Sequence, residues 1–257
     1  MSTAEYYNTL VAAISAGQKL SFGQDFFYNF YKSFIDGGRW QLYLNGILST
    51  FEVTVIALAI GIVLGVIVAV FRSMHDQQRL GHHNPILGIV NAICKIYTTV
   101  IRGTPMMVQL LILGFVIFKN SRNFTLVGAL GLGLNSGAYV AEIVRGGLMG
   151  VDRGQNEAGR SLGLTYIDTM RFIIIPQAFK SVLPSLGNEF ITLFKDTALI
   201  SVIGGKELVY AAKAVGAKTY SVLFPYLGIA IIYLILVMLF SWAQGKLERS
   251  LQKSDRR

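Results

Sequence analysis

Two long apolar runs limit what this chain can fold into more than any other feature. Residues 221–243 carry no charged side chain, and residues 46–71 carry only Glu52, close to their beginning. Each run is longer than the ~20 residues that an α-helix needs to cross the ~30 Å hydrocarbon layer of a bilayer. Because runs of this length are typical of transmembrane helices rather than of soluble cores, we expect an integral membrane protein.

The composition agrees with a membrane protein. Charged residues make up 14% and apolar residues 53% of the 257 residues, whereas about a quarter of the residues in soluble domains are charged. The net charge of +9 would favour a nucleic-acid partner in a soluble protein, but basic cytoplasmic loops explain it in a membrane protein. The single cysteine, Cys94, excludes an internal disulfide. Residues 1–5 contain no Lys or Arg ahead of an apolar run, so we expect no cleavable signal peptide.

Residues 86–118 are long for one span and contain a sequence that breaks helices. In Arg102-Gly103-Thr104-Pro105, a glycine precedes an X-Pro pair, which disfavours the helical conformation. We therefore expect an amphipathic approach helix, a break, and a span over about 104–118. Backbone groups freed by Pro105 can bind a polar solute, as broken helices do in transporters. The alternative is a plain kink whose freed carbonyl is satisfied by Arg102 or Thr104.

Five spans are expected in total, over residues 46–71, about 104–118, 124–148, 180–204 and 221–243. Residues 72–84 are expected to form a solvated loop and residues 205–220 another loop. The side of the membrane that includes loops 72–84 and 144–180 and the C-terminal segment carries twelve Lys and Arg residues, against eight on the other side. The positive-inside rule therefore places the N-terminus outside and the C-terminus in the cytoplasm.

Residues 20–36 precede the first span and are rich in aromatic side chains. Phe22, Phe26, Phe30 and Phe34 recur every four residues and so share one face of a helix. A helix lying in the membrane interface fits this pattern. A leader segment that packs on the helical bundle fits it equally well.

The segment 149–178 interrupts the apolar pattern with a charged sequence that has helix signals. Gly163 is suited to end a first short helix as its C′ residue. Thr165 is suited to cap a second one, with Asp168 three residues later as in a capping box. Pro176 is expected to stop or bend the chain before the fourth span. Two short helices on the membrane surface suit the docking of a soluble protein, although an inert connecting loop has the same signals.

The expected fourth span carries polar residues along one face. Ser185, Glu189, Thr192 and Asp196 are spaced 4, 3 and 4 residues apart, which places them on the same side of a helix. A charge at the centre of a transmembrane helix costs roughly 2.5–3.5 kcal/mol, so such residues are candidates for a functional cavity. The alternative is a structural ion pair between Lys195 and a carboxylate of another helix.

A second polar line follows the helix break. Arg102, Met106 and Gln109 are spaced 4 and 3 residues apart and share a face if the helix continues. Thr50 and Glu52 of the first span are suited to complete the wall of a cavity.

The sequence lacks the ATP-binding and zinc-protease motifs of an enzyme that acts alone. The stretch 216–219 is not a phosphate-binding loop, because Ala217 separates its glycine from its lysine. The zinc motif His-Glu-x-x-His does not occur. His75, His82 and His83 do not have the spacing of a known metal site. We therefore expect no catalytic residue, metal or cofactor.

Several motifs resemble the permease subunits of ATP-binding-cassette (ABC) importers. Glu157-Ala158, Gly163 and Ile175-Pro176-Gln177 are similar to the EAA loop of that family. Gly159 stands where the family has a second alanine, a change that lowers helix propensity by up to about 1 kcal/mol. Further similarity to the polar amino acid branch lies in 102–109, 138–146 and 188–199. In the last of these, Ala198 replaces the usual serine.

The resemblance covers about residues 45–250 and implies a type I importer permease, an all-α membrane protein with five core transmembrane helices. We therefore expect a permease domain over 41–250 with a cytoplasmic coupling loop over 149–178 and a cytoplasmic tail over 251–257. The extracytoplasmic arm (1–40), with its expected interfacial helix, lies outside the resemblance. The implied partners are two ATPase subunits, a second permease subunit, identical or different, and an external solute-binding protein. ATP hydrolysis by the partner would then drive alternating access to a polar amino acid.

The resemblance and the polar faces together give three groups of expected site residues. For substrate binding we expect Thr50, Met106, Gln109, Glu189 and Asp196. For coupling to the ATPase we expect Glu157, Ala158, Gly159, Gly163, Thr165, Asp168 and Pro176. For gating or structure we expect Arg102, Gly103, Pro105, Glu142, Arg145 and Lys195.

The main alternative is a secondary transporter or channel that works alone in the bacterial membrane. Five expected spans without a visible inverted repeat argue against it. A membrane anchor for a soluble complex is a third reading. The polar membrane faces argue against it, since an anchor has no use for their cost.

Overall fold

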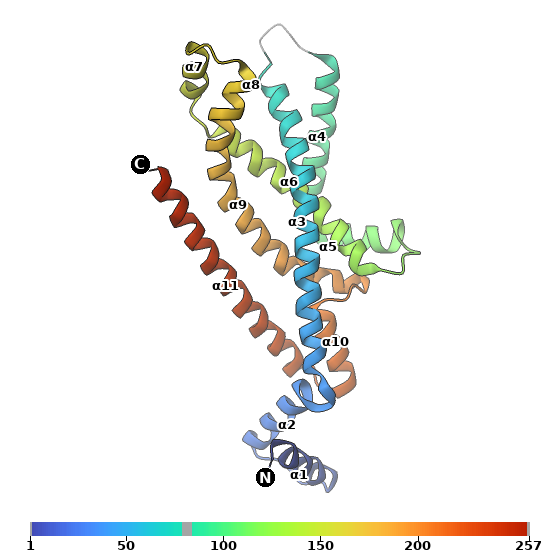
Figure 1. Ribbon diagram of the computed structural model, residues 1–257. Coiled ribbons are helices and arrows are strands. Elements are labelled where there is room, and N and C mark those ends of the chain that lie inside the picture. The colour runs from blue at the N-terminus through green and yellow to red at the C-terminus, as the bar shows by residue number, and fades with distance from the viewer. Residues whose placement is uncertain (1, 79–83, 256–257) are drawn as a thin grey trace. The chain divides into compact units, whose positions relative to one another are not determined.

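The computed structural model describes residues 2–78 and 84–255, and within these ranges it is helical without strands (Figure 1). Contacts divide the chain into two compact units. The first unit is Met1–Thr50 with Lys206–Leu236, and the second is Phe51–Gly205 with Val237–Arg257. Two long helices, α3 (Trp40–Asp76) and α11 (Leu223–Asp255), contribute residues to both units.

The first unit contains α1 (Thr3–Ser15), α2 (Phe22–Phe34), a 3-10 turn (Asp36–Gly38) and α10 (Leu208–Thr219), together with the beginnings of α3 and α11. Its core is formed by Tyr43, Leu208, Ala211, Ala212, Val215 and Ile229.

The loop expected over 205–220 is wrong, because most of it is α10. The apolar residues at 208, 211, 212 and 215 of this segment have the spacing of one buried helical face. The tight contact that follows explains Gly46 of α3. A Cβ atom at this glycine would lie 2.9 Å from the Cα atom of Leu208.

The second unit is built around α6 (Phe124–Met149), which packs against α3, α4 (Pro85–Gly103) and α9 (Ile175–Asp196). Two glycines bring α3 close to α6. A Cβ atom at Gly61 would lie 2.7 Å from Ser136 Oγ, and one at Gly65 would lie 2.6 Å from Val140 Cβ.

The remaining elements of the second unit are short. They are α5 (Met106–Ile112), a π turn (Leu113–Ile117), α7 (Arg153–Ser161), α8 (Tyr166–Thr169), a second π turn (Met170–Ile174) and a 3-10 helix (Thr197–Ile203).

Four helical segments in the described part of the chain are long and apolar enough to cross a membrane: Asp36–Asp76, Pro85–Gly103, Phe124–Met149 and Leu223–Leu251. The expected spans at 46–71 and 124–148, and all but the first two residues of that at 221–243, fall within three of them.

The expected span over 104–118 is wrong. The helix after the break, Met106–Ile117, has twelve residues and is only about 18 Å long at 1.5 Å per residue. Instead, α4 before the break has the required length. The helix α9 is long enough, but its mean hydropathy is too low for it to belong to the apolar set.

Two expected features lie partly outside the described residues. Of the loop expected at 72–84, the structure describes only residues up to 78 and residue 84, and α3 continues to Asp76. His82 and His83 lie outside the described residues, whereas His75 is on α3, with Nδ1 3.2 Å from Asn91 Nδ2. In the expected tail at 251–257, helix α11 continues to Asp255, and residues 256–257 are not described.

Candidate functional site

The first helix of the segment 149–178 ends in a Schellman turn. Gly163 has φ +82°, a conformation that a glycine adopts without steric cost. Its N–H donates to the carbonyl of Arg160 at 3.0 Å, and the N–H of Leu164 donates to the carbonyl of Gly159 at 3.1 Å. These two bonds satisfy carbonyls that a helix end otherwise leaves unpaired. The predicted order of short helix, glycine turn and short helix is therefore confirmed.

The second short helix begins as predicted at Thr165, but the cap differs in detail. The Thr165 hydroxyl accepts from the N–H of Asp168 at 3.2 Å and donates to the Asp168 carboxylate at 2.5 Å. In a capping box the carboxylate would instead accept from the backbone N–H of the capping residue. Asp168 thus fixes the capping hydroxyl rather than a second backbone group.

Pro176 does not stop the helix, contrary to the first of the two predicted outcomes. It lies in the first turn of α9, which follows the π turn Met170–Ile174 without interruption. The N–H of Ile175 donates to the carbonyl of Met170, five residues back. The first turn of a helix tolerates a residue that has no backbone donor, and the wider π turn makes room for the proline ring.

Gly159 lies where the two arms of this segment meet. A Cβ atom there would lie 2.9 Å from Thr169 Cγ2 and 3.1 Å from Ile173 Cδ1. The Thr169 side chain is fully buried. The glycine thus allows α7 to pack directly against the π turn.

The turn between the two short helices exposes apolar side chains. Leu162 is 82% and Ile167 73% exposed, and Leu164 and Tyr166 are also exposed. Such a patch on a surface turn is typical of an interaction site. The Tyr166 hydroxyl donates to Gln77 Oε1, which connects the turn to the end of α3. Partial burial raises the pKa of Tyr166 above its usual value. A cavity of about 970 Å³ lies between this segment, the end of α3 and the end of α6.

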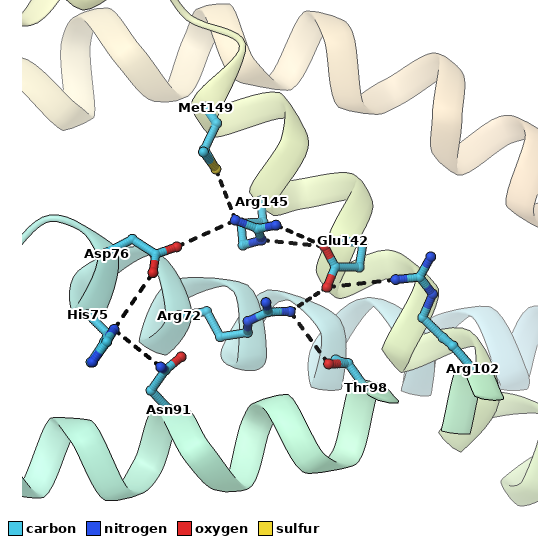
Figure 2. Close-up of polar contacts among 9 residues, drawn as sticks. All are labelled: Arg72, His75, Asp76, Asn91, Thr98, Arg102, Glu142, Arg145 and Met149. Carbon is cyan, nitrogen blue, oxygen red and sulfur yellow. Dashed lines mark hydrogen bonds and ion pairs between the residues drawn. The ribbon is translucent and has the colours of Figure 1, made fainter. Parts of the chain in front are cut away.

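Glu142 of α6 is the centre of a network of ion pairs (Figure 2). Its carboxylate contacts Arg72 of α3, Arg145 one turn later at 3.3 Å, and Arg102 of α4 at 3.8 Å. Arg145 also pairs with Asp76 at 3.4 Å.

The network holds three arginines against two carboxylates and joins α3, α4 and α6. The spacing of the sequence did not predict the participation of Arg72 and Asp76. Both stand near the end of a span, where charges are usual and carry no distinctive signal.

The helix break is present where it was predicted. Gln109 satisfies the carbonyl of Ile101, which Pro105 leaves without its helical partner. Gln109 Nε2 donates to the carbonyl of Ile101 and to Thr104 Oγ1, both at 2.8 Å. Its Oε1 accepts from Asn135 Nδ2 at 3.1 Å. Of the two predicted partners, Thr104 does satisfy a carbonyl at the end of α4, because its Oγ1 donates to the carbonyl of Val100 at 2.9 Å.

The expected polar face through Arg102 is also wrong, because the helix does not continue through the break. Arg102 belongs to α4, with its guanidinium 5.4 Å from the centre of the Tyr139 ring. Met106 begins α5 and packs against the apolar core of the second unit. Gly103 ends α4, and Pro105 has an extended backbone.

The polar face of α9 has partners on α6. Glu189 Oε1 accepts from Ser136 Oγ at 2.7 Å. Ser185 lines a cavity of about 590 Å³ that is also lined by Glu142, Gln177, Lys180 and Ser181.

Asp196 and Lys195 lie at the C-terminal end of the same helix. No carboxylate in the described part of the chain forms an ion pair with Lys195, so the predicted alternative of an interhelical pair is not observed.

Thr50 lies in the first unit, whereas the other four expected substrate residues lie in the second. It is fully buried, and its hydroxyl accepts from the N–H of Leu208 at 3.2 Å.

Comparison with known proteins gives a consistent set of relatives. Residues 61–253 match the family described as "Binding-protein-dependent transport system inner membrane component". The chain is 37% identical over 211 residues to the putative glutamine transport system permease protein GlnP of Rickettsia bellii, covering 81% of this chain and 92% of that protein. It is 35% identical over 217 residues to the arginine transport system permease protein ArtQ of Bacillus subtilis, covering 82% and 93%.

Solved structures agree with the fold. A chain from the "Crystal structure of an amino acid ABC transporter with histidines" matches with a TM-score of 0.73 and 36% identity, over 91% of this chain and all of that one. A chain of the MetNI methionine ABC transporter matches with a TM-score of 0.70 at 20% identity, over 84% of this chain and 99% of that one. The predicted type I importer permease fold is confirmed.

Proposed function

Because the chain belongs to the family of inner membrane components of binding-protein-dependent transport systems, we propose that it imports polar amino acids as a permease subunit of an ATP-driven transporter. The observation that carries this proposal is the coupling segment. A rigid turn displays an exposed apolar patch on a chain that has no phosphate-binding loop of its own. A separate ATPase then supplies the work.

The coupling residues divide between contact and support. Glu157 and the exposed side chains around Gly163 make the contact with the ATPase. Ala158 and Gly159 are small residues, which lets α7 pack closely against the π turn. Thr165 and Asp168 cap the beginning of the second helix, and Pro176 lies in the first turn of α9. When ATP closes the ATPase pair, the two coupling segments of the transporter approach each other, and the membrane cavity opens outward.

Movement reaches the membrane through the Glu142 network. Tyr166 is bonded to Gln77, next to Asp76, and Asp76 pairs with Arg145. Arg145 and Arg102 both contact Glu142, and Arg102 is one residue from the end of α4 at the break. A displacement of the coupling segment is therefore transmitted through these polar contacts to Arg102, next to the helix break before Pro105.

Substrate recognition is assigned to Met106, Gln109, Glu189 and Asp196, with Thr50 as a further candidate. The two carboxylates suit the ammonium group of an amino acid and a basic side chain. The amide of Gln109 is bonded to the chain in this conformation, so a contact with substrate requires it to exchange partners. Lys195 and the break residues Gly103 and Pro105 take part in gating.

The remaining proposals concern the assembly. The transporter contains two ATPase copies, a second permease subunit, and an extracytoplasmic solute-binding protein, in a bacterial cell membrane. The N-terminus lies outside and the C-terminus in the cytoplasm, as the distribution of Lys and Arg supports.

The test is reconstitution in lipid vesicles with the partner ATPase and the binding protein. ATPase activity is measured with each of the twenty amino acids. Stimulation by one or a few polar amino acids is expected, and a lack of response to all twenty contradicts the amino acid assignment. Flux through the permease without the ATPase would contradict ATP-driven import.

A further inference from the structure

One face of α2 is exposed and purely aromatic over two turns. Phe22, Phe26 and Phe30 are 90%, 51% and 42% exposed. Their spacing of four residues places them in one row, and the rings of Phe26 and Phe30 stack at 6.4 Å. Exposed aromatic rings in a row carry a free-energy cost in water, so this face requires an apolar surrounding.

The other faces of α2 are already covered. Phe27 packs on Tyr6 of α1 at 5.0 Å between ring centres, and Tyr31 packs on Tyr7 at 4.6 Å. Phe34 packs on Tyr43 of α3 at 5.1 Å. These contacts fix the orientation of α2 within the first unit, and they leave Phe22 almost fully exposed and Phe26 and Phe30 about half exposed.

The row of three phenylalanines is continuous with the surface of a transmembrane helix. The ring of Phe26 meets the edge of Phe224, in the first turn of α11, at 5.4 Å. One turn further along, the Phe34 ring lies directly on Gly228, where no Cβ atom would fit. The exposed side chains of α11 in this unit are apolar, among them Leu223, Leu227 and Ile231. The row thus lies beside the first turns of a helix that is long and apolar enough to cross a membrane.

Amphipathic aromatic residues mark the same level of the first unit. Trp40 begins α3, and Tyr226 lies in the first turn of α11. Tyr220, just before α11, is 95% exposed and has φ +53°, a conformation that is unfavourable for a bulky residue. Trp and Tyr are enriched where a transmembrane helix meets the headgroups, so these residues indicate the depth of the membrane surface.

We propose that α2 lies in the membrane interface, with Phe22, Phe26 and Phe30 in contact with lipid beside the beginning of α11. The row has no hydrogen-bonding group, which suits contact with acyl chains. Residues 1–40 carry three acidic and three basic residues. The contact therefore depends on apolar area and is independent of lipid charge.

The test uses the full transporter in lipid nanodiscs, with Cys94→Ser as background. Single cysteines at Phe22, Phe26 and Phe30 are labelled with a nitroxide, and Asp25→Cys on the polar side of α2 is the matched control. Collision rates with oxygen, which partitions into lipid, and with a water-soluble nickel chelate are measured by electron paramagnetic resonance. Phe22→Cys is the decisive variant, because this side chain is almost fully exposed and its loss removes little packing.

We expect the ratio of oxygen to nickel collisions to be several-fold higher at positions 22, 26 and 30 than at position 25. The ratio should be the same in neutral and anionic lipid. Equal ratios at positions 22 and 25 would overturn the proposal. Immobilisation of the labels only when the solute-binding protein is added would also overturn it, because the face would then be a protein interface.

Discussion

Two of the places where helices are interrupted in the second unit, the turn at Gly163 and the break before Pro105, are closed in different ways. At Gly163 the turn is closed by the backbone, since both hydrogen bonds come from N–H groups of the turn. At the break before Pro105, the freed carbonyl is held by the side chain of Gln109, which is itself held by Asn135 of α6. The first closure depends only on local conformation, and the second depends on the packing of two helices.

This difference suits the two proposed roles. A turn that transmits movement from an ATPase must keep its conformation when the ATPase moves. Backbone hydrogen bonds give the Gly163 turn that rigidity. A gate must have two states of similar free energy. A closure made by side chains can exchange partners, because an amide that leaves the break can bind water or substrate instead. We therefore expect substitutions at the two places to fail differently.

The largest effect on transport is expected from Gly163→Val. A β-branched residue in the left-handed conformation costs roughly 1–2 kcal/mol or more, and 1.4 kcal/mol corresponds to a factor of ten. Transport driven by ATP should fall about tenfold or more, while size-exclusion behaviour and melting temperature stay close to those of the parent. Gly163→Asn is the control and should retain most activity, because Asn tolerates this conformation. Full transport by the valine variant would show that the turn does not need its rigidity.

The beginning of α10 provides a third helix end, which is satisfied by a side chain. It tests whether such an end makes stability depend on pH. Glu207 begins α10, and its carboxylate accepts from the N–H groups of Val209 and Tyr210 at 2.7 and 2.8 Å. Its side chain is 1% exposed. Burial raises its pKa from 4.5 to about 7.

The folded protein therefore binds more protons than the unfolded chain between these two values. The contribution of Glu207 to the free energy of unfolding is therefore complete below about pH 4.5 and is lost as the pH rises through about 7. The total loss is on the order of 3 kcal/mol. Thermal unfolding of the purified protein should be measured from pH 5 to 8 beside Glu207→Gln. The parent should lose stability relative to the variant as the pH rises. A constant difference would contradict the raised pKa.

Gln109→Leu should destabilise the break by roughly 1–3 kcal/mol, because it removes two part-buried hydrogen bonds of about 0.5–1.5 kcal/mol each. Leucine leaves the carbonyl of Ile101 and the amide of Asn135 unpaired. Because Gln109 is also a proposed substrate residue, the readout is the melting temperature rather than transport. Asn135→Ala removes only one of these bonds and should cost less. If both variants melt like the parent, the break is not held by this amide.

The smallest effect is expected from Tyr166→Phe, which removes one hydrogen bond, to Gln77, worth about 0.5–1.5 kcal/mol. The turn itself keeps its backbone bonds and should still bind the ATPase. We expect transport per ATP hydrolysed to fall a few-fold while substrate-stimulated hydrolysis persists. Ile167→Ser, which alters the exposed patch, is the contrast and should weaken ATPase binding instead. If the two variants lose ATPase binding and transport to the same extent, then Tyr166 does not transmit movement separately from the residues that contact the ATPase.

Features determined by local chemistry were predictable from the sequence. Gly163 and Thr165 act within four residues of chain, and the apolar runs need only the thickness of a bilayer. The Arg102–Pro105 break was located for the same reason.

The errors concern features that depend on distant residues. Gln109 finds its second partner 26 residues away on α6, and spacing along one helix cannot indicate that contact. The helix in residues 205–220 buries its apolar face only against distant parts of the first unit. The π turn that carries the chain into Pro176 has no signal in the sequence.

The close packing at Gly159 limits how coupling segments can be exchanged between transporters. If a chimera receives this segment from a relative with alanine at that position, the additional methyl group meets whatever residue takes the place of Thr169. The two positions must then be transplanted together, and a library that varies them independently would lose most of its members to misfit. The pair therefore defines the smallest block of sequence that can be moved as one piece.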